Sequence, residues 1–177
     1  MPYMVAAIVL VGVLCLVNLL VCLGVVRRLR EYAARFDQMS AGSPEIGLAE
    51  GASVGAFEAV TLDDIAVSRD DLVGDTVVGF LTTECPPCHE RLPEFVEYAR
   101  GVAGRTRVLA VVIGPADAAP SMVPSLAEVA HVIRDDGGGA LSKAFAVRGF
   151  PAFFRLAGAT VTARGTSIAA LPAPSAA

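Results

Sequence analysis

The sequence predicts an α/β domain, with a central mixed sheet flanked by helices, preceded by one N-terminal transmembrane helix. Three observations support this. Residues 4–26 form an uncharged apolar run, and the later part of the chain alternates short β-branched runs with helical segments. A C-x-x-C pair, Cys85 and Cys88, lies where one buried strand should pass into a helix. Alternating strands and helices are typical of an α/β sheet, and a hairpin at the end would add antiparallel strands.

The apolar run contains 23 residues, and Asn18 is its one polar side chain. As a helix it would extend roughly 34 Å at about 1.5 Å per residue, enough to cross a bilayer core of about 30 Å. A cleaved signal peptide is the competing interpretation, but it normally begins with basic residues and has a shorter core. Cys15 and Cys22 are seven positions apart, on one face of this helix, and we interpret them as small apolar residues.

Residues 27–39 continue with a helical stripe of apolar side chains, which favours an amphipathic helix next to the membrane. Residues 40–53 are rich in Ser, Gly and Pro and predict a linker. The predicted boundaries are an anchor (1–26), a juxtamembrane helix and linker (27–52), a globular domain (53–166) and a tail (167–177).

Within the domain, apolar runs predict buried strands and amphipathic stretches predict helices. The predicted strands cover residues 76–81, 107–114 and 131–135, and the predicted helices cover 86–100, 123–130 and 139–147. Residues 151–165 predict a hairpin that turns at Ala157 and Gly158. About 120 residues remain after the anchor and linker, enough for a hydrophobic core.

The sequence "CPPCH" fits three kinds of site. It has the spacing of a redox dithiol, of covalent haem attachment and of half a zinc site. Haem would need a further ligand, for which Met122 and His131 are candidates. A structural zinc site usually has four protein ligands, whereas only Cys85, Cys88 and His89 lie close together here.

The cysteine count and the net charge argue against two classes of protein. Outside the predicted anchor the chain has two cysteines, too few for a disulfide-scaffold fold, so they indicate a functional pair. The net charge of the whole chain is −4 and no basic patch is present, which argues against a nucleic-acid partner.

Three segments, in this order, resemble the membrane-anchored thioredoxin-like thiol-disulfide oxidoreductases of the TlpA type, including the MauD-like branch. The segments are "GASVGAFEAVTLDDIAVSRDDLVGDTVVGF", "CPPCHERLPEF" and "VRGFPAFFRL". The resemblance covers about residues 51–165. It implies a thioredoxin-like fold and a cis-proline at Pro151 that lies against the dithiol, where neighbouring main chain, including that of Phe150, binds substrate.

The same resemblance implies function. It predicts a protein-disulfide reductase or exchanger with no cofactor beyond the redox-active Cys85–Cys88 disulfide. Its partners would be disulfide-containing exported proteins and a thiol electron donor such as a membrane redox relay. The chain departs from the family pattern in three places: Glu84 stands where a tryptophan is usual, Gly79 replaces a buried Asp or Asn, and the last helix is shortened.

Thiol-disulfide exchange requires an attacking thiolate and a resolving thiol. Cys85, just before the helix, is the predicted attacker, because the helix N-terminus favours negative charge, and Cys88 is the predicted resolving thiol. Pro86 and Pro87 fit the first turn of a helix but remove two N–H donors from the neighbourhood of the attacking sulfur.

Two further side chains modulate this expectation. Glu84 adds a negative charge beside Cys85 and, together with the missing donors, makes the thiolate less favourable. We therefore expect a reducing or balanced couple instead of a strong oxidant. His89 would oppose Glu84 if it faced Cys85 as a cation; otherwise it is a solvated residue of the helix surface.

Two other functions stay open. Thr82 and Cys85 reproduce the T-x-x-C of peroxiredoxins, although Val78 stands where those proteins have proline. A membrane-tethered assembly factor without turnover is the non-enzymatic alternative.

Sidedness is also contested. Four arginines, at positions 27, 28, 30 and 35, follow the anchor, which places the domain in the cytoplasm by the positive-inside rule. The resemblance implies the extracytoplasmic side, where disulfides persist. The expectation is a single-pass membrane protein with its domain outside.

Overall fold

The computed structural model describes residues 46–115 and 122–172, together with Tyr3, Met4, Gly12, residues 14–16 and Asn18. The chain divides into two compact units, residues 1–44 and 45–177, and the following description concerns the second. Most of the predicted anchor and all of the predicted juxtamembrane helix lie outside the described residues. Among the residues that are described, no helix is both long and apolar enough to cross a bilayer.

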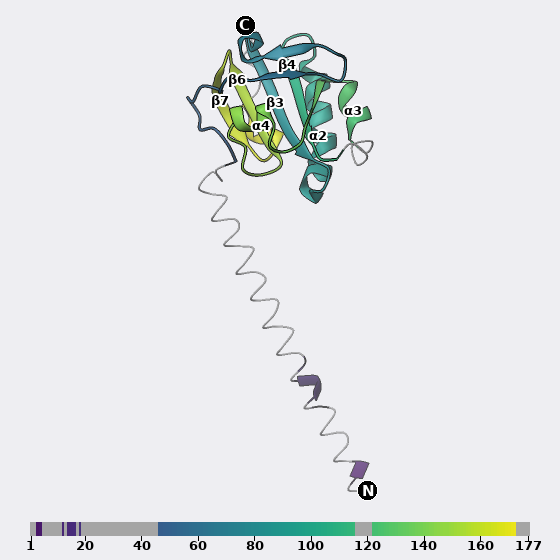
Figure 1. Cartoon of the computed structure of the whole chain (residues 1–177). Helices are drawn as coiled ribbons and strands as arrows, with labels where there is room; N and C mark the ends of the chain where they lie inside the picture. Colours follow the sequence, from purple (N-terminus) through teal and green to yellow (C-terminus); the bar gives the residue numbers. More distant parts are fainter. Residues whose placement is uncertain are drawn as a thin grey trace. The chain divides into compact units, whose positions relative to one another are not determined.

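A five-stranded mixed sheet organises the second unit, in the order β5-β4-β3-β6-β7 (Figure 1). Strand β3 (Asp75–Thr82) lies in the middle and runs parallel to β4 (Arg107–Ile113), which runs parallel to β5 (His131–Asp135). On its other side β3 pairs antiparallel with β6 (Ala152–Ala157), and β6 continues into β7 (Thr160–Gly165). The parallel half and the closing hairpin confirm the predicted mixed sheet.

Both faces of this sheet are covered. Helix α2 (Pro86–Val102), the short helix α3 (Val123–Ala127) and the 3₁₀ turn η3 (Ile168–Ala170) contribute buried residues on one face. Helix α4 (Ala140–Ala144) and the β1–β2 hairpin contribute them on the other. Successive residues of β3 alternate between these two clusters, as the pleat of a strand requires, and both sets are apolar.

The predicted strands and helices of the domain are confirmed with small shifts at their ends. The strand predicted over residues 131–135 matches β5, and the predicted hairpin turns at Gly158. The sequence analysis missed a small antiparallel sheet of β1 (Glu58–Val60) and β2 (Ala66–Ser68), followed by the 3₁₀ turn η1 (Arg69–Asp71). Each of these strands is only three residues long, so no alternation marks it.

The predicted linker is wrong in its second half. Ile46 is buried in the core, the Leu48 N–H donates to the Phe145 carbonyl, and Ser53 forms a bridge with Thr160 of β7. The physical reason is that β7 is an edge strand, and the preceding chain covers part of its open edge. The low periodicity of these residues reflects a segment that packs without forming a regular element.

The short C-terminal segment closes the α2 face. One 3₁₀ turn, η3, forms before Pro172, and Ile168 in this turn and Leu171 after it are buried. The Arg155 guanidinium donates to the Pro172 carbonyl and so holds the segment against the sheet. This face is therefore covered although the final helix is short.

Candidate active site

The dithiol lies at the carboxyl end of the central strand. After β3 ends at Thr82, a short turn brings Cys85 to the N-cap position of α2, and Cys88 follows in the first helical turn. The Cys85 carbonyl accepts a hydrogen bond from the Cys88 N–H at 3.0 Å, the first turn of the helix. Both thiols are free, so the structure represents the reduced form.

Cys85 is partly buried, and its surroundings come from two distant parts of the chain. Its sulfur donates a long hydrogen bond, 3.7 Å, to the main-chain carbonyl of Phe150. The Phe150–Pro151 peptide bond is cis, as the resemblance implied, and leads into β6. Antiparallel pairing of Phe80 with Ala152 places this bond beside the end of β3. The predicted substrate-binding positions, Phe150 and Pro151, therefore lie next to the predicted attacking sulfur.

Cys88 is fully buried. Burial raises the pKa of its thiol from 9.0 to about 12, a hydrogen bond with the Thr82 main chain opposes that shift, and the Cys85 thiol adds to it. The two sulfurs thus interact in the folded protein. One is partly accessible and the other is held as a neutral thiol, which is the asymmetry that an attacking and a resolving thiol need.

The apolar cover near the dithiol depends on a glycine. A Cβ atom at Gly79 would meet the Phe95 ring at 3.0 Å and the Phe153 ring at 3.2 Å. These two rings stack with their centroids 5.3 Å apart and belong to the same buried cluster as Cys88. The space where the resemblance implied an Asp or Asn is therefore filled by aromatic rings.

The remaining predicted residues lie around the mouth of the site. Glu84, Pro86 and Pro87 are exposed, and the two prolines occupy the first two positions of α2. The His89 side chain is also exposed, but its Nε2 lies 2.9 Å from the Thr83 carbonyl oxygen. Because a carbonyl only accepts, Nε2 carries the hydrogen in this contact. His89 therefore ties the helix to the turn before Cys85.

The other chemistries considered for "CPPCH" find little support in the described part of the chain. No group of three or more His, Cys, Asp and Glu side chains among those residues is arranged to hold a metal ion. The two candidate haem ligands also differ in exposure: Met122 is buried in the core, and His131 is exposed at the start of β5.

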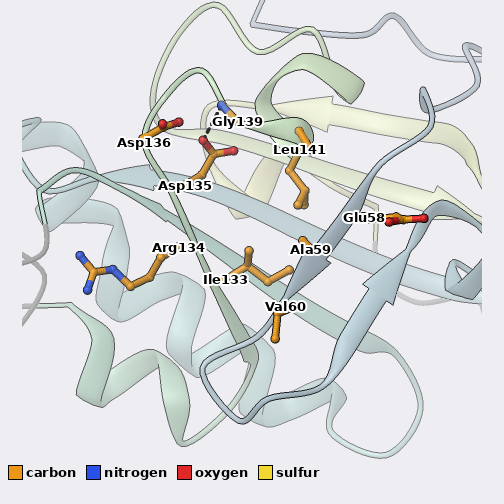
Figure 2. Close-up of a pocket in the computed structure, with 10 residues that line it drawn as sticks. Glu58, Ala59, Val60, Ile133, Arg134, Asp135, Asp136, Gly139 and Leu141 are labelled. Carbon is orange, nitrogen blue, oxygen red and sulfur yellow. Dashed lines mark hydrogen bonds between the residues drawn. The ribbon is translucent and has the colours of Figure 1, made fainter.

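A separate hollow of about 360 Å³ lies between β1, β5 and the start of α4, and neither cysteine lines it (Figure 2). Its most buried polar group is the Asp135 carboxylate, which accepts hydrogen bonds from the N–H groups of Gly137, Gly139 and Ser142 and from the Ser142 hydroxyl. These contacts satisfy the carboxylate within the chain, so it holds the connection between β5 and α4 together.

Sequence reasoning missed two contributors to the site. The Thr82 main chain contacts the Cys88 thiol through backbone atoms, which no residue type reveals. The stacked Phe95 and Phe153 cover the strand next to the dithiol. Gly79 in the middle of an apolar strand was the available signal, because an isolated glycine there indicates a close approach.

Comparison with known proteins supports the fold. No family model and no curated protein matches the sequence. A thiol-disulfide oxidoreductase from Bacteroides fragilis has a TM-score of 0.57 and 16% identity, and the match covers 68% of this chain and 94% of that one. The thioredoxin domain of a thiol-disulfide oxidoreductase from Bacteroides vulgatus has a TM-score of 0.52 and 16% identity, with 66% of this chain and 88% of that one covered. StoA from Bacillus subtilis has a TM-score of 0.52 and 18% identity, with 62% of this chain and 86% of that one covered. The described residues of the second unit therefore have a thioredoxin-like fold.

Proposed function

We propose that this protein is a membrane-tethered thiol-disulfide oxidoreductase of the TlpA type, which reduces or exchanges disulfides of exported proteins through Cys85 and Cys88. The observation that carries the proposal is the arrangement of the two thiols. A partly accessible sulfur lies at a helix N-cap against the Phe150 carbonyl, and a fully buried sulfur lies one turn away. The fold likeness to thiol-disulfide oxidoreductases supports it.

The reaction has two exchange steps. The Cys85 thiolate attacks one sulfur of a substrate disulfide, a mixed disulfide forms, and the other substrate sulfur leaves as a thiolate that takes up a proton. Cys88 then loses its proton and attacks the Cys85 sulfur, the Cys85–Cys88 disulfide forms, and the second substrate thiol is released. Two electrons pass to the substrate, and no other cofactor is required.

Neighbouring groups set the preference for reduction. Pro86 and Pro87 have no N–H to donate to the Cys85 sulfur, and the exposed Glu84 adds a negative charge to the same turn. Fewer hydrogen-bond donors and an added negative charge beside the sulfur favour the disulfide over the reduced form, which makes the protein a better reductant. The Phe150 and Pro151 main chain would bind the substrate peptide beside Cys85.

Location and partners follow from the apolar run at residues 4–26. We place this segment in the bilayer as a single span with the globular domain on the extracytoplasmic side, although the arginines after it favour the opposite orientation. A domain on that side needs a membrane redox relay or another thiol donor to return the Cys85–Cys88 disulfide to the dithiol. Nucleic acid is not among the proposed partners.

Trapping and labelling test the proposal. The C88S variant should accumulate mixed disulfides with exported proteins, because no resolving thiol remains; the C85S variant is the matched control and should accumulate none. In intact cells, a membrane-impermeant maleimide should label the wild-type protein more than C85S, which keeps the other three cysteines. Equal labelling of the two would contradict the extracytoplasmic orientation, and failure of C88S to trap any protein would contradict the exchange activity.

A further inference from the structure

We propose that no side chain of the described residues acts as a base in the resolving step of this dithiol, so that the Cys88 proton is lost directly to hydroxide and the mixed disulfide on Cys85 is long-lived at neutral pH. The proposal rests on the proposed exchange function and adds to it the rate-limiting step and its pH dependence. Three features of the described structure carry it: the burial of Cys88, the apolar groups that surround it, and the position of every nearby charge.

The first feature is burial. Cys88 has 0% exposure and lies in a cluster with Leu81, Phe95 and Phe153. Burial is also the largest cause of the raised pKa of its thiol. A thiol in such a place must pass its proton to a group that touches it, or wait for a hydroxide that reaches it from the Cys85 side.

The second feature is the shape of the apolar cover. The Phe95 and Phe153 rings fill the space over Gly79, so that a side chain at this position would need both rings to move. The polar partners of the Cys88 sulfur are the Thr82 main chain and the Cys85 side chain. A main-chain amide is not a base at neutral pH, and in the mixed disulfide the Cys85 sulfur is already bonded to substrate.

The third feature is the position of the charged side chains on the helices and strands that pack around Cys88. On α2 and the turn before it, the side chains of Glu84, His89, Glu90 and Arg91 are exposed, and the half-exposed Glu94 contacts Arg91 and Ser167. The half-buried Tyr98 packs against the Cys88 cluster, but its charged neighbours are Arg155 and Asp75. Asp75 of β3 and Arg155 of β6 are paired with each other at the opposite end of the sheet. Further charges from the other packed elements are on exposed residues: Arg107, Glu128, His131 and Arg148.

Within the described part of the chain, Cys85 is therefore the only titratable group whose charge raises the pKa of the Cys88 thiol. For the resolving step, the Cys88 S–H bond breaks, its proton joins hydroxide to form water, and the new thiolate attacks the Cys85 sulfur. The Cys85–substrate S–S bond breaks and the substrate sulfur leaves with the electron pair. The rate of this step follows the fraction of Cys88 thiolate, which rises about tenfold per pH unit below the thiol pKa.

A chromogenic disulfide separates the two steps. One equivalent of dithiobis-nitrobenzoate added to the reduced full-length protein should release one coloured thiolate when Cys85 attacks, and a second when Cys88 resolves the mixed disulfide. This leaving group departs as a stable thiolate, so it does not take up the Cys88 proton. The C88S variant should give the first release and lack the second.

The expected result is a second release that is slower than the first and accelerates about tenfold per pH unit from about pH 6 to about pH 9. A second release that levels off below about pH 8 would overturn the inference, because some protein group, in the described residues or in segment 116–121, would then accept the proton. Absence of the first release would instead contradict the proposed exchange function itself.

Discussion

The two ends of strand β3 are held in place by different kinds of contact. At the start of the strand, Asp75 accepts hydrogen bonds from the Arg155 side chain at 2.8 and 2.6 Å and from the Thr106 hydroxyl at 3.0 Å. At the end of the strand, the Cys85 N–H lies 3.5 Å from the Thr82 carbonyl, and the Cys85 sulfur lies 3.7 Å from the Phe150 carbonyl. Short charge-assisted contacts hold the start of the strand, whereas the Cys85 sulfur and N–H make only long contacts at its end, where the neighbouring Thr83 is tied to His89 and to β4.

This difference assigns the two ends of β3 different roles: the contacts at its start stabilise the fold, and the thiols at its end carry out exchange. The Arg155 side chain is only 5% exposed, so Asp75 is needed to compensate a buried charge. A sulfur that must exchange partners is better served by contacts that are easily given up. The comparison therefore predicts that substitutions at the two ends affect different measurements.

The largest effect expected is that of the C85S variant on exchange. A hydroxyl forms no disulfide, so reduction of a model disulfide protein should fall to the uncatalysed rate. The urea midpoint of C85S should match that of the reduced wild-type protein, because the Cys85 side chain is only partly buried and its hydrogen bond to the Phe150 carbonyl is long. Turnover retained by C85S would place the chemistry elsewhere.

At the other end, the D75A variant should destabilise the fold by about 3 kcal/mol, the lower part of the range for breaking a buried pair, because the Asp75 side chain is 31% exposed. Urea unfolding measures this loss. The D75A/R155M double variant should regain much of it, since no unpaired buried charge remains. The exchange rate of the folded fraction should not change, and a parallel loss of activity would show that the two ends are coupled.

A smaller effect tests how tightly the chain packs at the end of β3 that lies next to the dithiol. Gly114, at the end of β4, has a φ of +142°, and a Cβ atom there would lie 2.2 Å from the Thr83 hydroxyl oxygen. The G114A variant should therefore lose about 2 kcal/mol of unfolding free energy. The T83A/G114A double variant should lose less than the sum of the single variants. Strict additivity in urea melts would rule out the contact as the cause.

The effect that is smallest near neutral pH is a pH dependence of stability, which becomes measurable only above about pH 9. The pKa of Cys88 is raised to about 12, so the folded protein holds this proton more tightly than the unfolded chain. Its contribution is complete below about pH 9 and declines as the pH rises toward about 12, by at most about 1.4 kcal/mol per pH unit. The unfolding free energy of reduced wild-type protein should fall more steeply above about pH 9 than that of C88S. Parallel curves would contradict the burial of this thiol.

How far the sequence predicted the molecule depends on the element. Strands β3 and β4 were found because each is a long apolar run, and helix α2 because apolar side chains recur along one of its sides. The strands of the β1–β2 hairpin were missed because each has three residues and a largely exposed pattern. Residues 46–53 were taken for linker because packing against a sheet edge leaves no periodic signal.

The candidate site divides in the same way. The pair Cys85 and Cys88 and the cis-proline at Pro151 were predicted, the pair from its spacing and the proline from family resemblance. The interaction between the Thr83 carbonyl and His89 was not, because the acceptor is a backbone atom. The aromatic cover over Gly79 was not predicted either, because it brings together side chains from α2 and β6.

By itself the sequence determined the order of strands and helices and the position of two thiols at the junction between a strand and a helix. Both depend on residues close together in the chain, whose patterns and spacing can be read directly. Only the tertiary structure decided that the Cys85 sulfur contacts the Phe150 carbonyl, that Cys88 is surrounded by apolar groups, and that Asp75 pairs with Arg155 at the start of β3. Those features arise from contacts between distant segments, and burial, which sets the chemistry of a thiol, exists only once the segments have packed.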